Sequence, residues 1–504
     1  MEDGRKRKLL ATASCQGLAS DCLMDRLSEL PEEVAHHILS FLEIKDLTCF
    51  GCVSKRCRKL YLSTPSLKFD GFFSKQLQRY DERLRLWSYL DNYLFHRWVS
   101  RIQRFHFHWV LHSYGSQQIL QEDEKFRLDK FICNAIKCNV EVLDIKIKSW
   151  GSGAPLPTCV LHSGSLKSLS VYIYGRIIKA PSLASFSNLE CLKLEGTVLV
   201  DDGLFNWISC SCKCIKELSL KSVSMYNATS SCNVTIESSS LESLCIERLS
   251  FIHHLYIAGE KLEQIIIDWR FGFRSDKPHT DKSLGICAPN LNSLNWRGSL
   301  MNQPNLGRLE CLEEASICLL PSVDEFVYVS EVLSCLSSAK VLTLNKETTM
   351  ALFKGGSMPL LENVWYLCIH IEGFLDFQVP AMASLLGGMS KLNTLIIKSD
   401  SFFRGPKAEC CGFNIGYWKL QNAAFIYQLK EVTVELSHGS NGIEFDRYIL
   451  DHAQNLNKMT IVHSPQQSSA MSELKKSKMA SNITLVFQED QERGPQNRTR
   501  RRVV

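Results

Sequence analysis

The 504-residue sequence lacks the features that would mark a membrane protein or a nucleotide-dependent enzyme. It contains no apolar run of the length that spans a bilayer, which is about 20 residues. Neither a G-x-x-x-x-G-K-[ST] loop nor a G-x-G-x-x-G turn occurs, so both common phosphate-binding motifs are missing. We therefore expect no membrane partner and no nucleotide cofactor.

The sequence also has little net charge and no recognisable leader. A formal charge of +5 is small for this length, so we expect no specific binding of nucleic acid. Residues 1–10 are charged and lack the apolar core of a signal peptide. The 21 cysteines are then expected to be free thiols in the nucleus and/or the cytoplasm. Basic clusters at 5–8 and 498–502 are typical either of nuclear import signals or of disordered tails.

Metal and catalytic sites are not indicated. A zinc site usually needs cysteines in C-x-x-C pairs, whereas Cys210, Cys212 and Cys214 alternate and Cys410 adjoins Cys411. Serine, histidine and aspartate are scattered, and a catalytic triad is defined by geometry that spacing cannot supply. We therefore expect no metal, no cofactor and no catalytic residue.

A recurring pattern, apolar-x-x-apolar-x-apolar, covers most of the chain. Its copies are separated by about 21 to 31 residues, with two gaps of up to about 38, close to the period of leucine-rich repeats. The copies begin at Ile102, Val140, Leu166, Leu189, Ile215, Leu241, Leu262, Leu291, Leu312, Ala339, Leu361, Leu392, Leu429 and Leu456.

Each copy predicts one short strand whose last two apolar residues face the same way, because strand side chains alternate between faces. One repeat cannot bury that face alone, so stacked repeats share a core. The pattern predicts an α/β leucine-rich-repeat solenoid, a horseshoe with a parallel sheet on its concave face and helices outside. Helices are expected at 128–136, 204–208, 332–336 and 445–456. The copy from Leu361 allows two readings. Either Val364 and Tyr366 face inward, or an extra residue brings Trp365, Leu367 and Ile369 inward instead.

The stretch from 25 to 70 does not follow the repeat and predicts three short helices. Pro31 suits the first turn of a helix whose Val34, Ile38 and Leu42 share a face. Asp46 and Ser54 are expected to cap the second and third helices. A module this small has a marginal core and often leaves apolar surface for a partner.

This stretch resembles an F-box. The resemblance rests on Leu30-Pro31, on ILSFL at 38–42 and on VSKR at 53–56. Cys57 and Tyr61 depart from it, because plant members usually carry tryptophan there. Residues 199–220 and EFDRYILDHAQNLNKMTI at 444–461 are similar to the inner repeats and the FBD-type segment of plant F-box/leucine-rich-repeat proteins.

The resemblance implies a non-catalytic substrate adaptor of an SCF-type cullin–RING ubiquitin ligase. The F-box would dock on a Skp-type adaptor, and the solenoid would hold an unknown protein target for ubiquitination. The alternative is a repeat scaffold whose degenerate F-box no longer docks, or a simple helical cap. The expected adaptor-binding residues are Leu30, Pro31, Ile38, Leu39, Leu42 and Val53.

Residues between the inward apolar positions would face the concave side and could bind the target, although such positions can equally be solvated strand faces. We expect target contacts from Tyr172, Tyr174, Lys193, Lys221, Asp268, Arg270 and Arg297. A basic stripe of Lys146, Lys193, Lys221, Arg270 and Arg297 is a further hypothesis, motivated by spacing, for binding an acidic segment or a small anion.

These patterns divide the chain into five parts. We expect a basic N-terminal tail at 1–22, the F-box at 23–70, a helical linker at 71–97, the solenoid at 98–487 with an FBD-type segment at 420–487, and a basic C-terminal tail at 488–504.

Overall fold

The computed structural model divides the chain into two compact units, Met1–His106 and Phe107–Val504. The division falls within strand β2 (Arg104–Val110). The described residues are 30–69, 80–97, 101–111, 118–148, 155–181, 187–226, 232–249, 252–269, 283–300, 303–355, 358–399, 410–421, 423–436, 439–463, 483–489 and isolated positions between 467 and 474. The expected tails at 1–22 and 488–504 lie almost entirely outside these ranges.

The first unit contains the three predicted helices and a fourth. Their bounds are α1 (Glu32–Leu39), α2 (Ile44–Gly51), α3 (Lys55–Ser63) and α4 (Tyr80–His96), with β1 (Ser66–Phe69) between the last two. The Ser54 hydroxyl caps α3 by accepting a hydrogen bond from the Cys57 backbone N–H at 3.1 Å, as predicted. The prediction for Asp46 is wrong, because Glu43 precedes α2 and Asp46 lies in its first turn.

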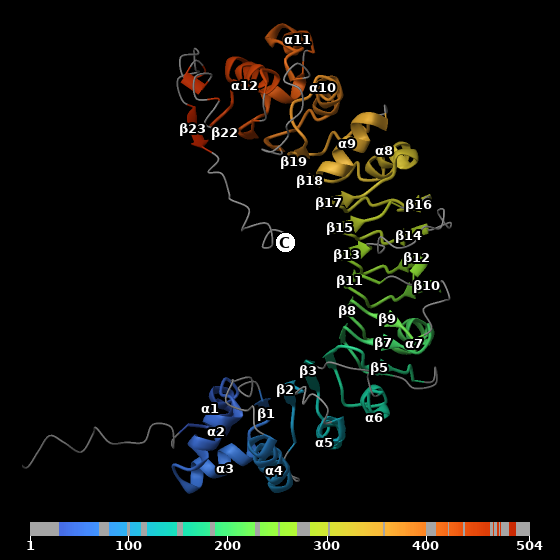
Figure 1. The fold of residues 1–504 in the computed structure, drawn as a ribbon, viewed down its shortest axis with the longest axis vertical. Helices are drawn as coiled ribbons and strands as arrows, with labels where there is room; N and C mark the ends of the chain where they lie inside the picture. Colours follow the sequence, from blue (N-terminus) through green and yellow to red (C-terminus); the bar gives the residue numbers. More distant parts are fainter. Residues whose placement is uncertain are drawn as a thin grey trace, which may run out of the picture. The chain divides into compact units, whose positions relative to one another are not determined.

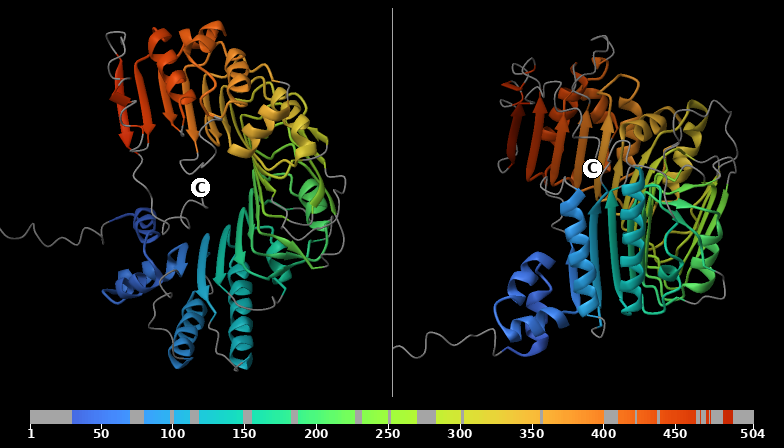
Figure 2. Two further views of the ribbon diagram at one scale, coloured as in Figure 1. Left: turned by 45° about the horizontal axis from the view of Figure 1, so that its top comes forward. Right: turned by 60° about the horizontal axis from the view of Figure 1, so that its bottom comes forward.

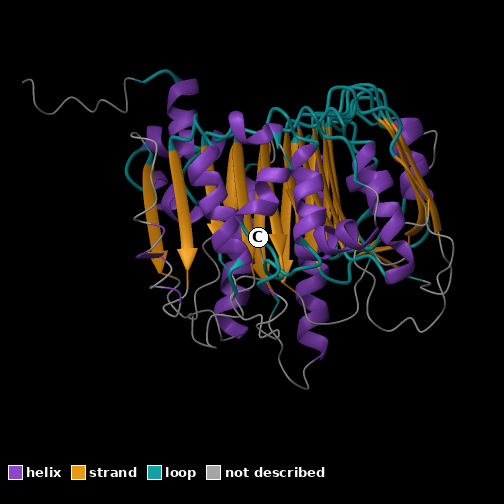
Figure 3. Cartoon of the chain, turned by 90° about the horizontal axis from the view of Figure 1, so that it is seen from above, coloured by secondary structure: helices purple, strands orange, loops and turns teal. Residues whose placement is uncertain are grey.

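The second unit is built on a long parallel sheet. Its strands lie side by side along an arc, with the sheet on the inner side (Figures 1 and 3). In order, they are β3 (Val142–Lys148), β4 (Ser168–Ile173), β6 (Cys191–Glu195), β8 (Glu217–Lys221), β11 (Ser243–Glu247), β13 (Gln264–Trp269), β15 (Ser293–Gly298), β17 (Glu314–Leu319), β18 (Val341–Leu344), β19 (Tyr366–Ile371), β20 (Thr394–Ser399), β21 (Glu431–Glu435), β22 (Lys458–His463) and β23 (Thr484–Glu489).

The repeat pattern sets the register of this sheet. The middle apolar residue of each copy pairs with its counterpart on the next strand, and these side chains are at most 1% exposed. From β3 to β22 they are Leu143, Leu169, Leu192, Leu218, Leu244, Ile265, Leu294, Ala315, Leu342, Leu367, Leu395, Val432 and Met459. A continuous apolar core therefore runs along the arc, as expected when repeats share it. The predicted fold class is confirmed.

Helices cover the outer face of the sheet over both ends of the arc (Figure 2). They are α5 (Gln118–Lys137), α6 (Thr158–Leu161), α7 (Gly203–Ser211), α8 (Phe326–Ser334), α9 (Lys346–Gly355), α10 (Val379–Gly387), α11 (Ile415–Leu420) and α12 (Asn441–His452), with 3₁₀ turns η2 (Val323–Glu325) and η4 (Ala424–Tyr427). The four segments in which helices were expected all contain helices.

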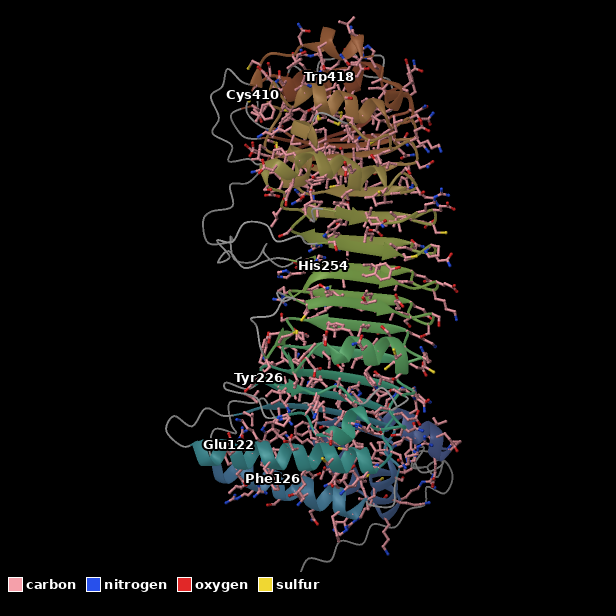
Figure 4. All side chains as sticks on the ribbon, turned by 90° about the vertical axis from the view of Figure 1, so that its right-hand side faces the viewer. Glu122, Phe126, Tyr226, His254, Cys410 and Trp418 are labelled. Carbon is pink, nitrogen blue, oxygen red and sulfur yellow. The ribbon has the colours of Figure 1, made fainter. Side chains whose placement is uncertain are left out.

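Strands replace helices on the outer face in the middle of the arc, which sequence periodicity did not predict. A four-stranded parallel sheet consists of β10 (Cys232–Glu237), β12 (Ile252–Ala258), β14 (Ser283–Cys287) and β16 (Gln303–Asn305). A smaller sheet contains β5 (Ile177–Ile178), β7 (Val198–Leu199) and β9 (Ser224–Met225). The cause is local: β10 alternates buried and exposed residues, the period of a strand rather than of a helix. Figure 4 looks onto this outer side and labels His254 of β12.

At the copy from Leu361, each of the two predicted readings is half right. Leu367 and Ile369 pair with the inward residues of β18 and are fully buried. Val364 is also fully buried, whereas the Trp365 side chain is 43% exposed. The copy therefore begins at Val364, three residues later than Leu361, because Val364 precedes Leu367 by the same three positions that separate Ala339 from Leu342.

A buried asparagine connects three segments near the C-terminal end of the arc. Asn441, only 1% exposed, donates from Nδ2 to the Phe374 carbonyl at 2.8 Å and to Asp376 Oδ1 at 2.7 Å. Its Oδ1 accepts from the Phe413 backbone N–H at 3.0 Å. Asp376 Oδ1 also accepts from the Gly412 N–H, so the loops before α10 and α11 are fixed to the start of α12.

Candidate functional site

The first unit exposes apolar side chains along α1 and after α2. Val34, Ile38 and Phe41 follow each other at i, i+4 and i+7 along α1 and its last turn, and are 44%, 41% and 72% exposed. Val53, after α2, is 75% exposed. We call these four residues the apolar strip. Exposure of neighbouring large apolar groups on so small a unit indicates a surface for a partner.

The predicted adaptor-binding residues fall into three groups. Pro31, Ile38 and Val53 are exposed, while Leu30 and Leu42 are partly buried. Leu39 is 3% exposed and belongs to the core of the module together with Ala35. Val34 and Phe41 were missed, although the i, i+4, i+7 spacing from residue 34 could have identified both.

The two departures from the F-box pattern are packed inside the module. Cys57 is 5% exposed, and Tyr61 lies against Tyr93 with ring centroids 4.9 Å apart. The Tyr61 hydroxyl bonds to that of Tyr89 at 2.9 Å, and Thr48 joins both hydroxyls. Burial raises the pKa of Tyr61 well above its usual value, so this phenol stays protonated. Tyr89 and Tyr93 of α4 thus pack around Tyr61, which is smaller than the tryptophan usual at this place in plant members.

A buried arginine joins α3 to the end of α4. Arg97 is 1% exposed and donates from Nη1 to the Tyr61 carbonyl at 3.2 Å and to the Tyr93 hydroxyl at 2.7 Å. Its Nη2 donates to the Thr64 carbonyl. Burial raises the pKa of Tyr93 to about 12, although the Arg97 charge acts in the opposite direction. The described part of the expected linker therefore stabilises the C-terminal end of α3.

In the second unit, the register places polar side chains in rows on the concave face. One row continues from strand to strand, one residue beyond the last inward position of each copy. We call it the charged row, and it consists of Lys146, Tyr172, Glu195, Lys221, Glu247, Asp268 and Arg297.

The hypothesis of a basic stripe is wrong at Lys193 and Lys221, because a glutamate pairs with each of these lysines. Lys221 Nζ lies 2.9 Å from Glu247 Oε1, and this hydrogen bond raises the pKa of Lys221. Lys193 Nζ lies 2.7 Å from Glu217 Oε1 on the neighbouring strand. Arg270 lies outside the described residues.

Two of the predicted target-binding residues, Tyr172 of the charged row and Tyr174, form an aromatic pair. Lys146 Nζ lies 5.1 Å from the centre of the Tyr172 ring, and the Tyr172 and Tyr174 rings meet edge to face at 5.4 Å. The hydrogen bond to Tyr174 raises the pKa of Tyr172 to about 12. Tyr174 is 46% exposed and its ring covers Gly196, where a Cβ would lie 2.8 Å from Tyr174 Cδ1.

The other predicted target-binding residues are buried or already bonded to neighbouring side chains, which leaves less of them for contact with a target. Asp268 is only 8% exposed, so its carboxylate offers little surface. Arg297 is partly buried and donates from Nε to Asn295 Oδ1 at 3.1 Å on its own strand. Lys193 and Lys221 are half exposed and already paired. Tyr172 and Tyr174 therefore lie together, whereas Asp268 and Arg297 lie four and five strands further along the sheet.

Sequence reasoning missed a row of neutral residues on the concave face toward the C-terminal end. The position between the two inward residues carries Ser316, Thr343, Cys368, Ile396, Thr433 and Thr460 on β17 to β22. Trp365 lies at the start of β19 against Tyr366, with ring centroids 6.1 Å apart.

No group of three or more histidine, cysteine, aspartate or glutamate side chains in the described ranges is arranged to hold a metal ion. Among the helices that the structure describes, none combines the length and the apolarity that crossing a bilayer needs.

Two known families match successive parts of the chain. Residues 27–60 match the F-box domain model, and residues 128–311 match the model for the leucine-rich repeats of FBD-associated F-box protein At5g56370. The chain carries an F-box followed by leucine-rich repeats. The predicted resemblance is thereby confirmed on both of its parts, and neither matching model describes a catalytic domain.

Relatives of this F-box/leucine-rich-repeat chain occur in Arabidopsis thaliana. F-box/LRR-repeat protein At3g58900 is 27% identical over 44% of this chain and 65% of its own length. Putative F-box/LRR-repeat protein At3g58880 is 25% identical over 75% of this chain and 78% of its own length. F-box/FBD/LRR-repeat protein At3g26920 is 23% identical over 92% of this chain and 96% of its own length. The similarity therefore extends over the F-box and the repeats together.

Proposed function

We propose that this protein is the target-recognition subunit of an SCF-type ubiquitin ligase, acting in the nucleus and/or the cytoplasm. Its F-box binds a Skp-type adaptor, and its repeats bind a protein to be ubiquitinated. The observation that carries the proposal is the apolar strip, which remains exposed on a module whose own core is closed. The matching F-box model supports the same reading.

The strip is sufficient to contribute substantially to binding. Burying a Val, Ile or Phe side chain completely stabilises by about 1.5–3 kcal/mol. Scaled by the exposed fractions of Val34, Ile38, Phe41 and Val53, a partner that covers the strip gains roughly 5 kcal/mol before association costs. Polar neighbours and backbone contacts would have to supply the remainder.

The departures at Cys57 and Tyr61 do not favour the alternative of a scaffold that cannot dock. Both side chains are buried, and Tyr89 and Tyr93 complete the packing around Tyr61. Neither of the two residues is part of the apolar strip. The smaller residues therefore change the interior of the module rather than the face that we assign to the adaptor.

The concave face of the solenoid is the proposed target surface. Tyr174 is an exposed aromatic group and Tyr172, partly buried, lies beside it; aromatic residues often dominate binding energy. The protein then acts without catalytic residues of its own. Holding the target beside the ligase raises the effective concentration of target lysines at the ubiquitin-transfer site.

Co-purification with a Skp-type adaptor tests the proposal. We expect the wild-type chain to co-elute with the adaptor, and the double variant Ile38→Asp, Val53→Asp to bind about 100-fold more weakly, a loss of about 3 kcal/mol. Phe95→Asp is the matched control, because Phe95 is 73% exposed on α4, outside the strip. Its affinity should equal that of the wild type.

Two results would contradict parts of this proposal. A wild-type chain that stays monodisperse but does not bind the adaptor would favour the scaffold alternative. Equal binding by the double variant and the control would show that another face of the F-box makes the contact.

A further inference from the structure

Two cysteine thiols from different helices meet on the outer side of the second unit. Cys133 lies on α5 and Cys159 on α6, and their sulfur atoms are 3.5 Å apart. Both side chains are partly exposed to solvent. Figure 4 shows the outer side of α5, on which it labels Glu122 and Phe126.

Three other described cysteines have close partners of a different kind. Cys191 Sγ donates to Glu217 Oε2 at 3.3 Å, and Cys245 Sγ donates to Glu247 Oε1 at 3.4 Å. Cys232 Sγ lies 3.4 Å from Met225 Sδ, a thioether that cannot form a disulfide. These three cysteines approach a carboxylate or a thioether, whereas Cys133 and Cys159 bring two thiols together, the pair of groups that can form a disulfide.

We propose that Cys133 and Cys159 form an oxidation site that closes to an intramolecular disulfide when the protein meets a hydroperoxide. In the first step, one thiolate attacks the peroxide O–O bond, giving a sulfenic acid and releasing the other oxygen as water or an alcohol. In the second step, the other thiol attacks the sulfenic sulfur, the S–S bond forms and the sulfenic oxygen leaves as water. One peroxide thus accepts the two electrons that both thiols lose.

The environment of the pair assigns the order of attack. Burial, together with the hydrogen bond to Cys133, raises the pKa of the Cys159 thiol to about 11. Cys159 therefore stays protonated near neutral pH and donates toward its neighbour. Because the thiolate is the nucleophile, we assign the first attack to Cys133 and the second to Cys159.

The movement required is small. A disulfide bond is about 2.05 Å long, so the sulfurs must approach each other by roughly 1.5 Å. Rotation of the side chains can supply much of this distance, because both sulfurs already face each other across the helix contact.

The disulfide would join the outer layers of two successive repeats. Cys133 precedes β3 and Cys159 lies between β3 and β4, so a bond over 26 positions encloses β3. Repeat proteins open locally, because each repeat contacts only its neighbours. Oxidation is therefore expected to suppress local opening of the strands that carry Lys146 and Tyr172 in the charged row.

Peptide mapping of the full-length protein tests the chemistry. The reduced protein, freed of reductant, is treated with hydrogen peroxide, its remaining thiols are alkylated, and its peptides are analysed by mass spectrometry. We expect a cross-linked peptide pair containing Cys133 and Cys159 that is two hydrogen atoms lighter than the reduced pair. In Cys159→Ser, a sulfenic acid trapped at Cys133 should accumulate instead.

Matched controls separate the site from general thiol oxidation. Cys191→Ser and Cys245→Ser remove thiols whose pKa burial likewise raises to about 11, but which donate hydrogen bonds to glutamate carboxylates. Both variants should form the same cross-link as the wild type. Full alkylation of Cys133 and Cys159 after peroxide, or linkage of either to several other cysteines, would refute the proposal.

Hydrogen exchange tests the structural consequence. In the oxidised protein, amide exchange in β3 and β4 should slow, and dithiothreitol should restore the original rate. Exchange in β20 and β21, far along the sheet, should not change. A cross-link that forms without slowing β3 and β4 would retain the oxidation site but refute the expected loss of local opening.

Discussion

Replacing Arg97 with methionine should release the end of the F-box from α4. The change keeps a long, flexible side chain but removes hydrogen bonds to the Tyr61 carbonyl, the Thr64 carbonyl and the Tyr93 hydroxyl. Each buried polar group left without a partner costs about 1–3 kcal/mol. Relief of the desolvation cost of the buried guanidinium offsets part of this loss. We therefore expect a net destabilisation of about 3 kcal/mol.

Amide hydrogen exchange of the full-length protein measures this loss where it occurs. Peptides from α3 and α4 should exchange about 100-fold faster in Arg97→Met than in the wild type, since about 1.4 kcal/mol corresponds to a factor of ten. Peptides from β19 to β21 should be unaffected. Arg85→Met is the control, because Arg85 is exposed on the same helix.

Equal exchange in Arg97→Met and Arg85→Met would refute the reasoning. It would mean that water or neighbouring groups replace the guanidinium without cost. A uniform increase over the whole chain would also contradict it, because the loss should remain within the first unit.

Two further predictions concern the second unit. Asp446 is fully buried and both carboxylate oxygens lack a hydrogen-bond partner among the described residues; burial raises its pKa well above the usual value. The folded state then holds a proton that the unfolded state releases, so the free energy of unfolding falls as pH rises above the unfolded pKa. Asp446→Asn should remove this pH dependence, which amounts to up to about 1.4 kcal/mol per pH unit. Urea unfolding of both proteins from pH 4 to 8 measures it. If the unfolding free energies of the two proteins change with pH in parallel, the prediction is contradicted. Arg248 has a φ of 58°, a left-handed conformation that costs free energy for any residue with a Cβ atom. The turn after β6 has Gly196 in a similar conformation, with a φ of 70°. Arg248→Gly should therefore raise the unfolding free energy by about 1 kcal/mol. Arg248→Ala should not, and equal stabilisation by both variants would show that the side chain, not the backbone, is responsible.

The core of the solenoid could be predicted from sequence because its signal is repeated. The inward positions of nearly every copy, from Leu143 to Met459, are those that the pattern indicated. The copy at Leu361 shows the limit of this method. The copy begins three residues later, at Val364, and the pairing of Leu367 with Leu342 is what decides this phase.

The candidate sites were less predictable, because exposure depends on what packs nearby. Ile38 and Leu39 are adjacent and equally apolar, yet one is on the apolar strip and the other is in the core. The basic stripe failed for a similar reason. Lys193 and Lys221 occupy the expected face, but their charges are neutralised by glutamates of neighbouring strands, which only the pairing register brings close.

The Asn441 contacts affect how the protein could be shortened. Its amide bonds to atoms 65 and 67 positions earlier in the chain. A truncation that removes α12 would leave the Phe374 carbonyl and the Asp376 carboxylate without this donor, although both belong to a repeat that the truncated chain still contains. The smallest stable fragment must therefore include Asn441, even if an earlier repeat is already complete.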